Sequence, residues 1–175
     1  MTRKPRRNIG LIGFMGTGKS TIGKALAEST GMKFFDTDNL VEKLAVKTIT
    51  QIFREDGEDS FRRLESIVIE EVCKNESAVI SFGGGSVLSP LNVEMMKSRS
   101  IIILLRASVE TVLARTASNN LRPLLVVDAD NIKNRIASLI EDRRIAYENA
   151  MDFDIDTDHL EIYDAVETIR KRLDI

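Results

Sequence analysis

The sequence has little of several things, and each shortage excludes a class of protein. It contains one cysteine, Cys73, so an intramolecular disulfide is impossible. It has no apolar run of the length that a transmembrane helix needs, and no apolar segment that would complete a secretion signal follows the basic residues 1–7. A net charge of −2 gives no overall attraction to nucleic acid or to an anionic membrane. We therefore expect a cytoplasmic protein that has neither a membrane nor a nucleic acid as its partner.

The remaining composition is that of an ordinary globular domain. The chain has 175 residues, of which 43% are hydrophobic and 30% are charged, so residues 1–175 are expected to form one domain with a sizeable core. Residues 1–7 hold four basic side chains and no acid, and we interpret them as a frayed basic tail. The one histidine, His159, has neither a nucleophile nor a set of metal ligands to pair with, so we interpret it as structural.

The stretch with the clearest chemistry is Gly13 to Ser20, GFMGTGKS, which has the spacing G-x-x-x-x-G-K-[ST]. In this motif, the phosphate-binding P-loop, glycines let successive backbone N–H groups face phosphate oxygens. Lys19 would reach the β- and γ-phosphates, and the Ser20 hydroxyl is placed to bind Mg²⁺. A strand-like run at 9–12 precedes the motif and a helical pattern at 20–29 follows it, as the motif requires. The alternative, a structural glycine turn, would not need lysine and serine at its end.

Apolar strand patterns alternate with helical patterns along the whole chain. The predicted strands are 8–12, 33–35, 78–82, 101–105 and 153–156, and the predicted helices are about 20–30, 38–46, 49–55, 58–74, 90–97, 108–117, 131–150 and 159–173. This alternation predicts an α/β fold of three layers, with a parallel sheet covered by helices on both faces. Ligands of such sheets bind beyond the carboxyl ends of the strands, so the residues after each strand are the candidates for function.

Two candidate groups follow the second and third predicted strands. Asp36 and Asp38 come after the second strand, where one carboxylate could reach Mg²⁺ through water and the other could take a proton from a substrate hydroxyl. Either could instead cap the helix that follows. Three glycines, Gly83, Gly84 and Gly85, follow the third strand and offer bare backbone N–H groups to a ligand, unless they only form a tight turn.

Arginines supply the other candidates. Arg62 and Glu65 are i, i+3 neighbours on a predicted helix, so the carboxylate could orient the guanidinium for a bidentate grip on an anion, although such pairs are commonly solvated surface pairs. Arg122 lies in a polar segment that ends a helix and is either a mobile lid over a phosphoryl group or a surface loop. Of Arg143 and Arg144, one is expected to face a cleft and the other solvent.

Taken in order, these residues identify a resemblance to the shikimate kinase family, within the nucleoside monophosphate kinase-like P-loop fold. It rests on GFMGTGKST, on FDTD after the second strand, on FRRLE, on GGG after the third strand, on LRPLL and on R-x-x-x-Y in the helix after it. The motifs span residues 9–147 in family order. The resemblance implies a five-stranded sheet of order 2-3-1-4-5 with a lid at about 119–128, and a monomer.

The resemblance also implies an activity: transfer of the γ-phosphoryl group of MgATP to the 3-hydroxyl of shikimate, in aromatic amino acid biosynthesis. The implied catalytic residues are Lys19, Asp38 and Arg122. The implied nucleotide-binding residues are Gly13, Met15, Gly16, Thr17, Gly18, Lys19, Ser20, Thr21, Arg115 and Arg122, with Arg115 beside adenine. The implied substrate-binding residues are Asp38, Phe61, Arg62, Glu65, Gly83, Gly84, Gly85 and Arg143, from a region around 33–62 and the neighbouring helices. Ser20 and Asp36 would hold Mg²⁺.

Three other functions are less well supported by the sequence. A kinase for another small polyol acid, such as gluconate, is disfavoured by the two arginines and the three glycines. A GTP-dependent switch protein is disfavoured because no N-K-x-D guanine motif and no aspartate after the third strand occur. A non-catalytic nucleotide-binding protein is disfavoured because every catalytic candidate is present. Residues 158–160 depart from the family pattern, which affects the adenine contacts and leaves the phosphate site unaffected.

Overall fold

The computed structural model describes residues 8–116 and 131–175. Its five strands form one sheet in the order β2-β3-β1-β4-β5, and every neighbouring pair is parallel. The strands are β1 (Asn8–Ile12), β2 (Lys33–Asp36), β3 (Ala78–Ser81), β4 (Ser100–Arg106) and β5 (Phe153–Asp156). The predicted strand order and the α/β class are therefore confirmed. The basic tail at 1–7 and the predicted lid at about 119–128, with Arg122, lie outside the described residues.

The helices lie close to the positions that the periodicity of the sequence predicts. They are α1 (Lys19–Thr30), α2 (Thr37–Ala45), α3 (Ile49–Glu55), α4 (Glu58–Cys73), α5 (Pro90–Arg99), α6 (Val109–Thr116), α7 (Ile132–Ala150) and α8 (Ile162–Leu173), with a short 3₁₀ turn η1 (Ser86–Leu88). The largest difference is at α8, which begins three residues after its predicted start. Asp158 accepts a hydrogen bond from the backbone N–H of Ser108 and belongs to a turn before the helix, and His159 lies exposed in that turn.

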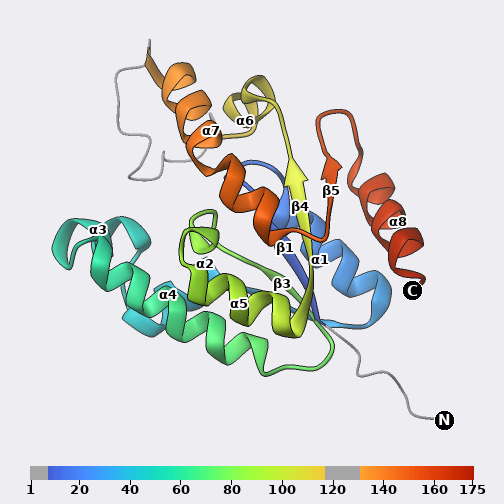
Figure 1. Cartoon of the computed structure of the whole chain (residues 1–175), viewed down its shortest axis with the longest axis horizontal. Coiled ribbons are helices and arrows are strands. Elements are labelled where there is room, and N and C mark those ends of the chain that lie inside the picture. Colours follow the sequence, from blue (N-terminus) through green and yellow to red (C-terminus); the bar gives the residue numbers. More distant parts are fainter. Residues whose placement is uncertain (1–7, 117–130) are drawn as a thin grey trace.

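Two apolar clusters cover the two faces of the sheet, because side chains alternate along each strand. In β4, Ile102 and Leu104 pack into the cluster formed with α4 and α5, whereas Ile103 and Leu105 pack into the cluster formed with α1 and α8. Figure 1 shows α1 and α8 on one side of the sheet and α4 and α5 on the other. This burial on both faces explains why β4 is a continuous apolar run, as strands of covered parallel sheets are.

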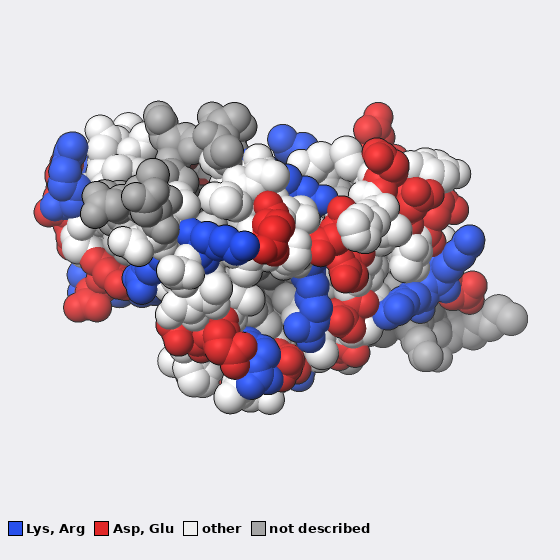
Figure 2. Space-filling view, turned by 90° about the horizontal axis from the view of Figure 1, so that it is seen from above, with Lys and Arg blue, Asp and Glu red and all other residues white. Residues whose placement is uncertain are grey.

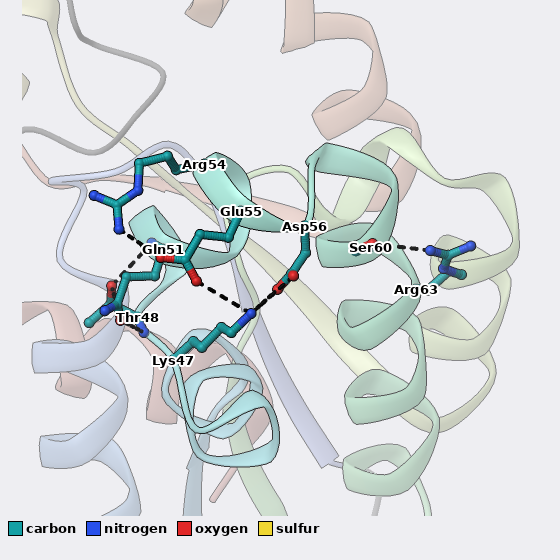
Figure 3. Close-up of polar contacts among 8 residues, drawn as sticks. All are labelled: Lys47, Thr48, Gln51, Arg54, Glu55, Asp56, Ser60 and Arg63. Carbon is teal, nitrogen blue, oxygen red and sulfur yellow. Dashed lines mark hydrogen bonds and ion pairs between the residues drawn. The ribbon is translucent and has the colours of Figure 1, made fainter.

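The segment from α2 to α4 is fastened by polar contacts at its turns (Figure 3). Lys47, between α2 and α3, donates to both carboxylate oxygens of Asp56 at 3.0 and 2.7 Å and lies 3.4 Å from Glu55. Thr48 and Gln51 form a capping box at the start of α3. These contacts restrain the ends of the short helix α3, whose side chains Ile49 and Phe53 face the site described below.

Charges of both signs are mixed on the face of the molecule that Figure 2 shows. Figure 2 shows lysines and arginines interspersed with acidic residues on one face, so that no single sign dominates there. Among the described residues, no helix combines the length and the apolar character that crossing a membrane would take.

Candidate active site

The P-loop follows β1 and leads into α1, as its sequence context predicts. Gly13, Gly16 and Gly18 have φ angles of 143°, 76° and 94°, in the region that favours glycine. A side chain on Gly13 would also collide with the backbone carbonyl of Leu105. Lys19 is the first residue of α1, and its Nζ donates to the carbonyls of Gly13 and Phe14 at 2.8 and 2.9 Å. The loop therefore brings a lysine and a helix N-terminus together, which suits phosphate.

Ser20 and Asp36 meet at the carboxyl ends of β1 and β2. The Ser20 hydroxyl donates to Asp36 Oδ2 at 2.5 Å, and Asp36 Oδ1 accepts from the backbone N–H of Asn39 at 3.3 Å. Asp36 is therefore the N-cap of α2, which is the alternative that the sequence offered for either aspartate. Within the described residues, no group of three or more acidic, histidine or cysteine side chains could hold a metal. A hydroxyl and a carboxylate beside a phosphate site nevertheless fit Mg²⁺, which takes one or two protein oxygens and fills its shell with phosphate and water.

Arg62 and Glu65 lie side by side on α4, with their charged groups next to the glycines that follow β3. Arg62 Nη1 is 2.9 Å from Glu65 Oε2, and the Ser86 hydroxyl donates to Glu65 Oε1 at 2.8 Å. The Glu65 side chain is only 2% exposed, so the alternative of a solvated surface pair is wrong for it. Burial raises the pKa of the Glu65 carboxyl, and the nearby Arg62 guanidinium offsets part of this rise. Burial lowers the pKa of Arg62, but the charges and hydrogen bonds of Glu65 and Glu58 together outweigh burial and leave that pKa raised.

The three glycines after β3 lie where side chains of other elements converge. A Cβ on Gly83 would lie 2.6 Å from Asp38 Oδ1 and 2.8 Å from Glu65 Oε1. A Cβ on Gly85 would lie 2.5 Å from Arg62 Nη1. The backbone N–H of Gly83 donates to the buried Thr37 hydroxyl at 2.9 Å. Gly83 and Gly85 therefore allow a close approach of these side chains, beyond any role in a turn.

Arg143 and Tyr147, one turn apart on α7, both point at this glycine loop. Arg143 Nη1 and the Tyr147 hydroxyl donate to the Gly84 carbonyl at 3.2 and 2.6 Å. The guanidinium of Arg143 also lies over the Phe14 ring, 5.7 Å from its centroid. Arg143 is buried, whereas Arg144 is exposed and pairs with Glu141 and Glu148, so the predicted division between the two arginines is confirmed.

A pocket collects most of the predicted substrate residues. Its lining combines charged groups with backbone and an apolar wall: Met15, Asp38, Ile49, Phe53, Phe61, Arg62, Glu65, Gly84, Gly85 and Arg143. Gly83 is not among the lining residues and lies behind Asp38 and Glu65. Sequence reasoning missed Ile49 and Phe53. Their i, i+4 spacing on a short helix indicates one apolar face, but gives no sign that this face meets a site instead of the core.

A second pocket lies on the other side of the P-loop. It is lined by Gly18, Thr21, Ile22, Arg115 and the segment from Thr157 to Ile162. Arg115 donates to the Thr157 hydroxyl and carbonyl at 3.1 and 2.8 Å, and to the carbonyl of Gly16 at 3.3 Å. The predicted nucleotide residues Thr21 and Arg115 therefore share one pocket, together with the segment whose sequence departs from the family pattern.

The P-loop thus separates a pocket with two arginines and an aspartate from a pocket beside the start of α1. A nucleotide whose phosphates lie on the loop would have room for its base in the second pocket and would present its last phosphate to the first. The fold and these two pockets define a P-loop kinase that phosphorylates a small molecule.

Comparison with known proteins gives the family. The family model for shikimate kinase matches residues 15–174. A shikimate kinase of Caldicellulosiruptor saccharolyticus is 45% identical over 163 residues, with 93% of each chain covered. Shikimate kinase from Acinetobacter baumannii, solved in complex with shikimate, superposes with a TM-score of 0.91 at 34% identity and covers 96% of this chain and 93% of its own. This chain belongs to the shikimate kinase family and is an ATP-dependent phosphotransferase.

Proposed function

We propose that the protein transfers the γ-phosphoryl group of ATP, bound with Mg²⁺, to the 3-hydroxyl of shikimate. The observation that carries the proposal is the pocket in which Arg62 of α4 and Arg143 of α7 meet beside Asp38. Shikimate has one carboxylate and three hydroxyls on a ring. The family membership and the shikimate bound to the Acinetobacter relative support this substrate.

Each part of the pocket suits a part of that substrate. Arg62 and Arg143 would bind the carboxylate, because a guanidinium offers two parallel donors, and Glu65 would hold Arg62 in place. Asp38 would accept the proton of the reacting hydroxyl. Phe61, with Ile49 and Phe53, would pack against the ring, and the backbone of Gly84 and Gly85 would line its edge.

The nucleotide would lie along the P-loop from Gly13 to Thr21. The backbone N–H groups around Met15, Gly16, Thr17 and Gly18 would surround the phosphates, and Lys19 would follow the γ-phosphoryl group during transfer. Arg115 would lie against the base. Mg²⁺, held by Ser20 and by Asp36 through water, would neutralise charge on the β- and γ-phosphates. Arg122 completes this proposed set, although it lies outside the described residues.

The deciding experiment measures ADP release by a coupled assay, with MgATP and either shikimate, gluconate or AMP as acceptor. Release that depends on shikimate alone is expected. Release with gluconate alone would overturn the substrate but keep the kinase, and no release with any acceptor despite ATP binding would overturn catalysis itself. Arg62→Ala should then raise KM for shikimate and leave KM for ATP unchanged, because it removes a contact to the carboxylate.

A further inference from the structure

The R-x-x-x-Y motif holds a tyrosine that the proposed reaction does not use. Tyr147 is 5% exposed, and its hydroxyl donates to the Gly84 carbonyl at 2.6 Å. Arg143, one turn earlier on α7, donates to the same oxygen at 3.2 Å. The shorter distance belongs to the tyrosine. The Tyr147 hydroxyl is therefore the closer of the two donors that hold this carbonyl.

The peptide that carries this carbonyl joins two glycines, so little besides hydrogen bonds restrains its rotation. Glycine has no Cβ, and a peptide between Gly84 and Gly85 can turn over with less steric resistance than any other. Carbonyl and N–H point in opposite directions from a trans peptide. A turned peptide would present the N–H of Gly85 to Arg143 and Tyr147, which are themselves donors here. Two donors on one oxygen therefore select a single orientation.

Gly84 itself lies between the two halves of the site. A Cβ on Gly84 would be 3.4 Å from the Gly13 carbonyl, 3.7 Å from Arg143 Nη1 and 3.8 Å from the Met15 nitrogen. Gly84 is thus in contact range of the P-loop backbone as well as of the arginine. Burial raises the pKa of Tyr147 to about 12, against the opposing effect of the Arg143 charge, so the hydroxyl remains a donor at neutral pH.

We propose that Tyr147 is a positioning residue for substrate binding: its hydroxyl fixes the Gly84 carbonyl, and the carbonyl in turn holds the Arg143 guanidinium in the direction that binds the substrate carboxylate. Tyr147 itself touches neither the substrate nor the nucleotide in this scheme. The inference rests on the proposed function, because it assigns the Arg143 contact to an acidic substrate.

The chain offers a matched test, because it contains two tyrosines. Tyr147→Phe removes the buried hydroxyl and keeps the ring, whereas Tyr163→Phe makes the same change on α8, where the side chain is 72% exposed. Loss of one hydrogen bond that positions the arginine should raise KM for shikimate about three- to tenfold in Tyr147→Phe. KM for ATP should stay unchanged in both variants, and KM for shikimate should stay unchanged in Tyr163→Phe.

If the role of Tyr147 were purely structural, Tyr147→Phe would lower the thermal midpoint and would shift both KM values or kcat together. That result would overturn the inference. So would an unchanged KM for shikimate. These outcomes are separate from failure of the proposed function, in which the wild-type protein itself would not phosphorylate shikimate.

A double-mutant cycle tests the route through Arg143. Shikimate binding is measured by calorimetry for Arg143→Gln, for Tyr147→Phe and for the pair. If Tyr147 acts through Arg143, adding Tyr147→Phe to Arg143→Gln should weaken binding by less than about twofold. Equal effects of Tyr147→Phe in both backgrounds would show that the tyrosine acts by another route and would overturn the proposal.

Discussion

The sharpest prediction concerns two adjacent glycines, because substitution by alanine should affect KM for shikimate differently at Gly84 and at Gly85. At Gly85 an added Cβ would be 2.5, 2.7 and 2.9 Å from Nη1, Nη2 and Cζ of Arg62. At Gly84 the nearest atom would be 3.4 Å away, which is ordinary contact. Gly85 has a φ of −102°, so alanine strains no backbone there. Any difference between the two alanine variants must therefore come from Arg62.

The expected magnitude follows from the displacement of that guanidinium. To restore ordinary contact with the new Cβ, it must shift by about 1 Å. Its hydrogen bond to Glu65, now 2.9 Å long, would then be lost or badly strained, together with the contact to a substrate carboxylate. A hydrogen bond between charged groups contributes about 1.5–3 kcal/mol, so KM for shikimate should rise about 10- to 100-fold in Gly85→Ala.

The assay is steady-state ADP release at varied shikimate and saturating ATP, with the thermal midpoint of each variant as a control for folding. Gly85→Ala should remain folded, with a midpoint lowered by about 3–12 °C for the strained Arg62–Glu65 bond, because the atoms it meets are the far end of a flexible side chain. Gly84→Ala should keep KM for shikimate within about twofold. Equal KM values in the two variants, or a larger effect at Gly84, would refute the assignment of Arg62 to the carboxylate.

Four further predictions follow from single residues. Lys19→Met should nearly abolish turnover with no change in the circular dichroism spectrum, since Lys19 lies in the phosphate-binding loop, where its Nζ donates to the carbonyls of Gly13 and Phe14; wild-type turnover would contradict it. Asp38→Asn should lower kcat about 10²- to 10⁴-fold if Asp38 is the base, whereas an unchanged kcat would leave it a binding residue. Val46 ends α2 with a φ of 54°, so Val46→Gly should raise the thermal midpoint, and a lower midpoint would argue against that backbone strain. Burial raises the pKa of the Cys73 thiol from 9.0 to about 11. The stability that the buried neutral thiol contributes is therefore present below pH 9 and lost as the pH rises toward 11. At pH 9 Ellman's reagent should react slowly with the protein until urea is added, and fast reaction of the folded protein would refute the burial.

The sequence alone determined the elements and the phosphate site. Periodicity placed every described strand and helix within about three residues, because covered parallel strands and amphipathic helices leave patterns that depend only on the local chain. The P-loop could likewise be read directly, since its glycines, Lys19 and Ser20 act within one continuous stretch. The motifs after it then indicated the family, although each was open to a structural reading when taken by itself.

Only the tertiary structure decided which side chains share a pocket and what holds them there. The i, i+3 spacing of Arg62 and Glu65 allowed a surface pair, but in the fold Glu65 is buried and accepts a hydrogen bond from Ser86 of η1. The apolar face of α3 became a wall of the pocket because the packing of α3 against neighbouring elements turns that face toward Arg62 and Arg143. Arg143 and Tyr147 share the carbonyl of Gly84, which lies about 60 positions earlier in the chain, and local patterns cannot reveal such a contact. Contacts of this kind depend on the packing of several elements, which no single stretch of sequence encodes.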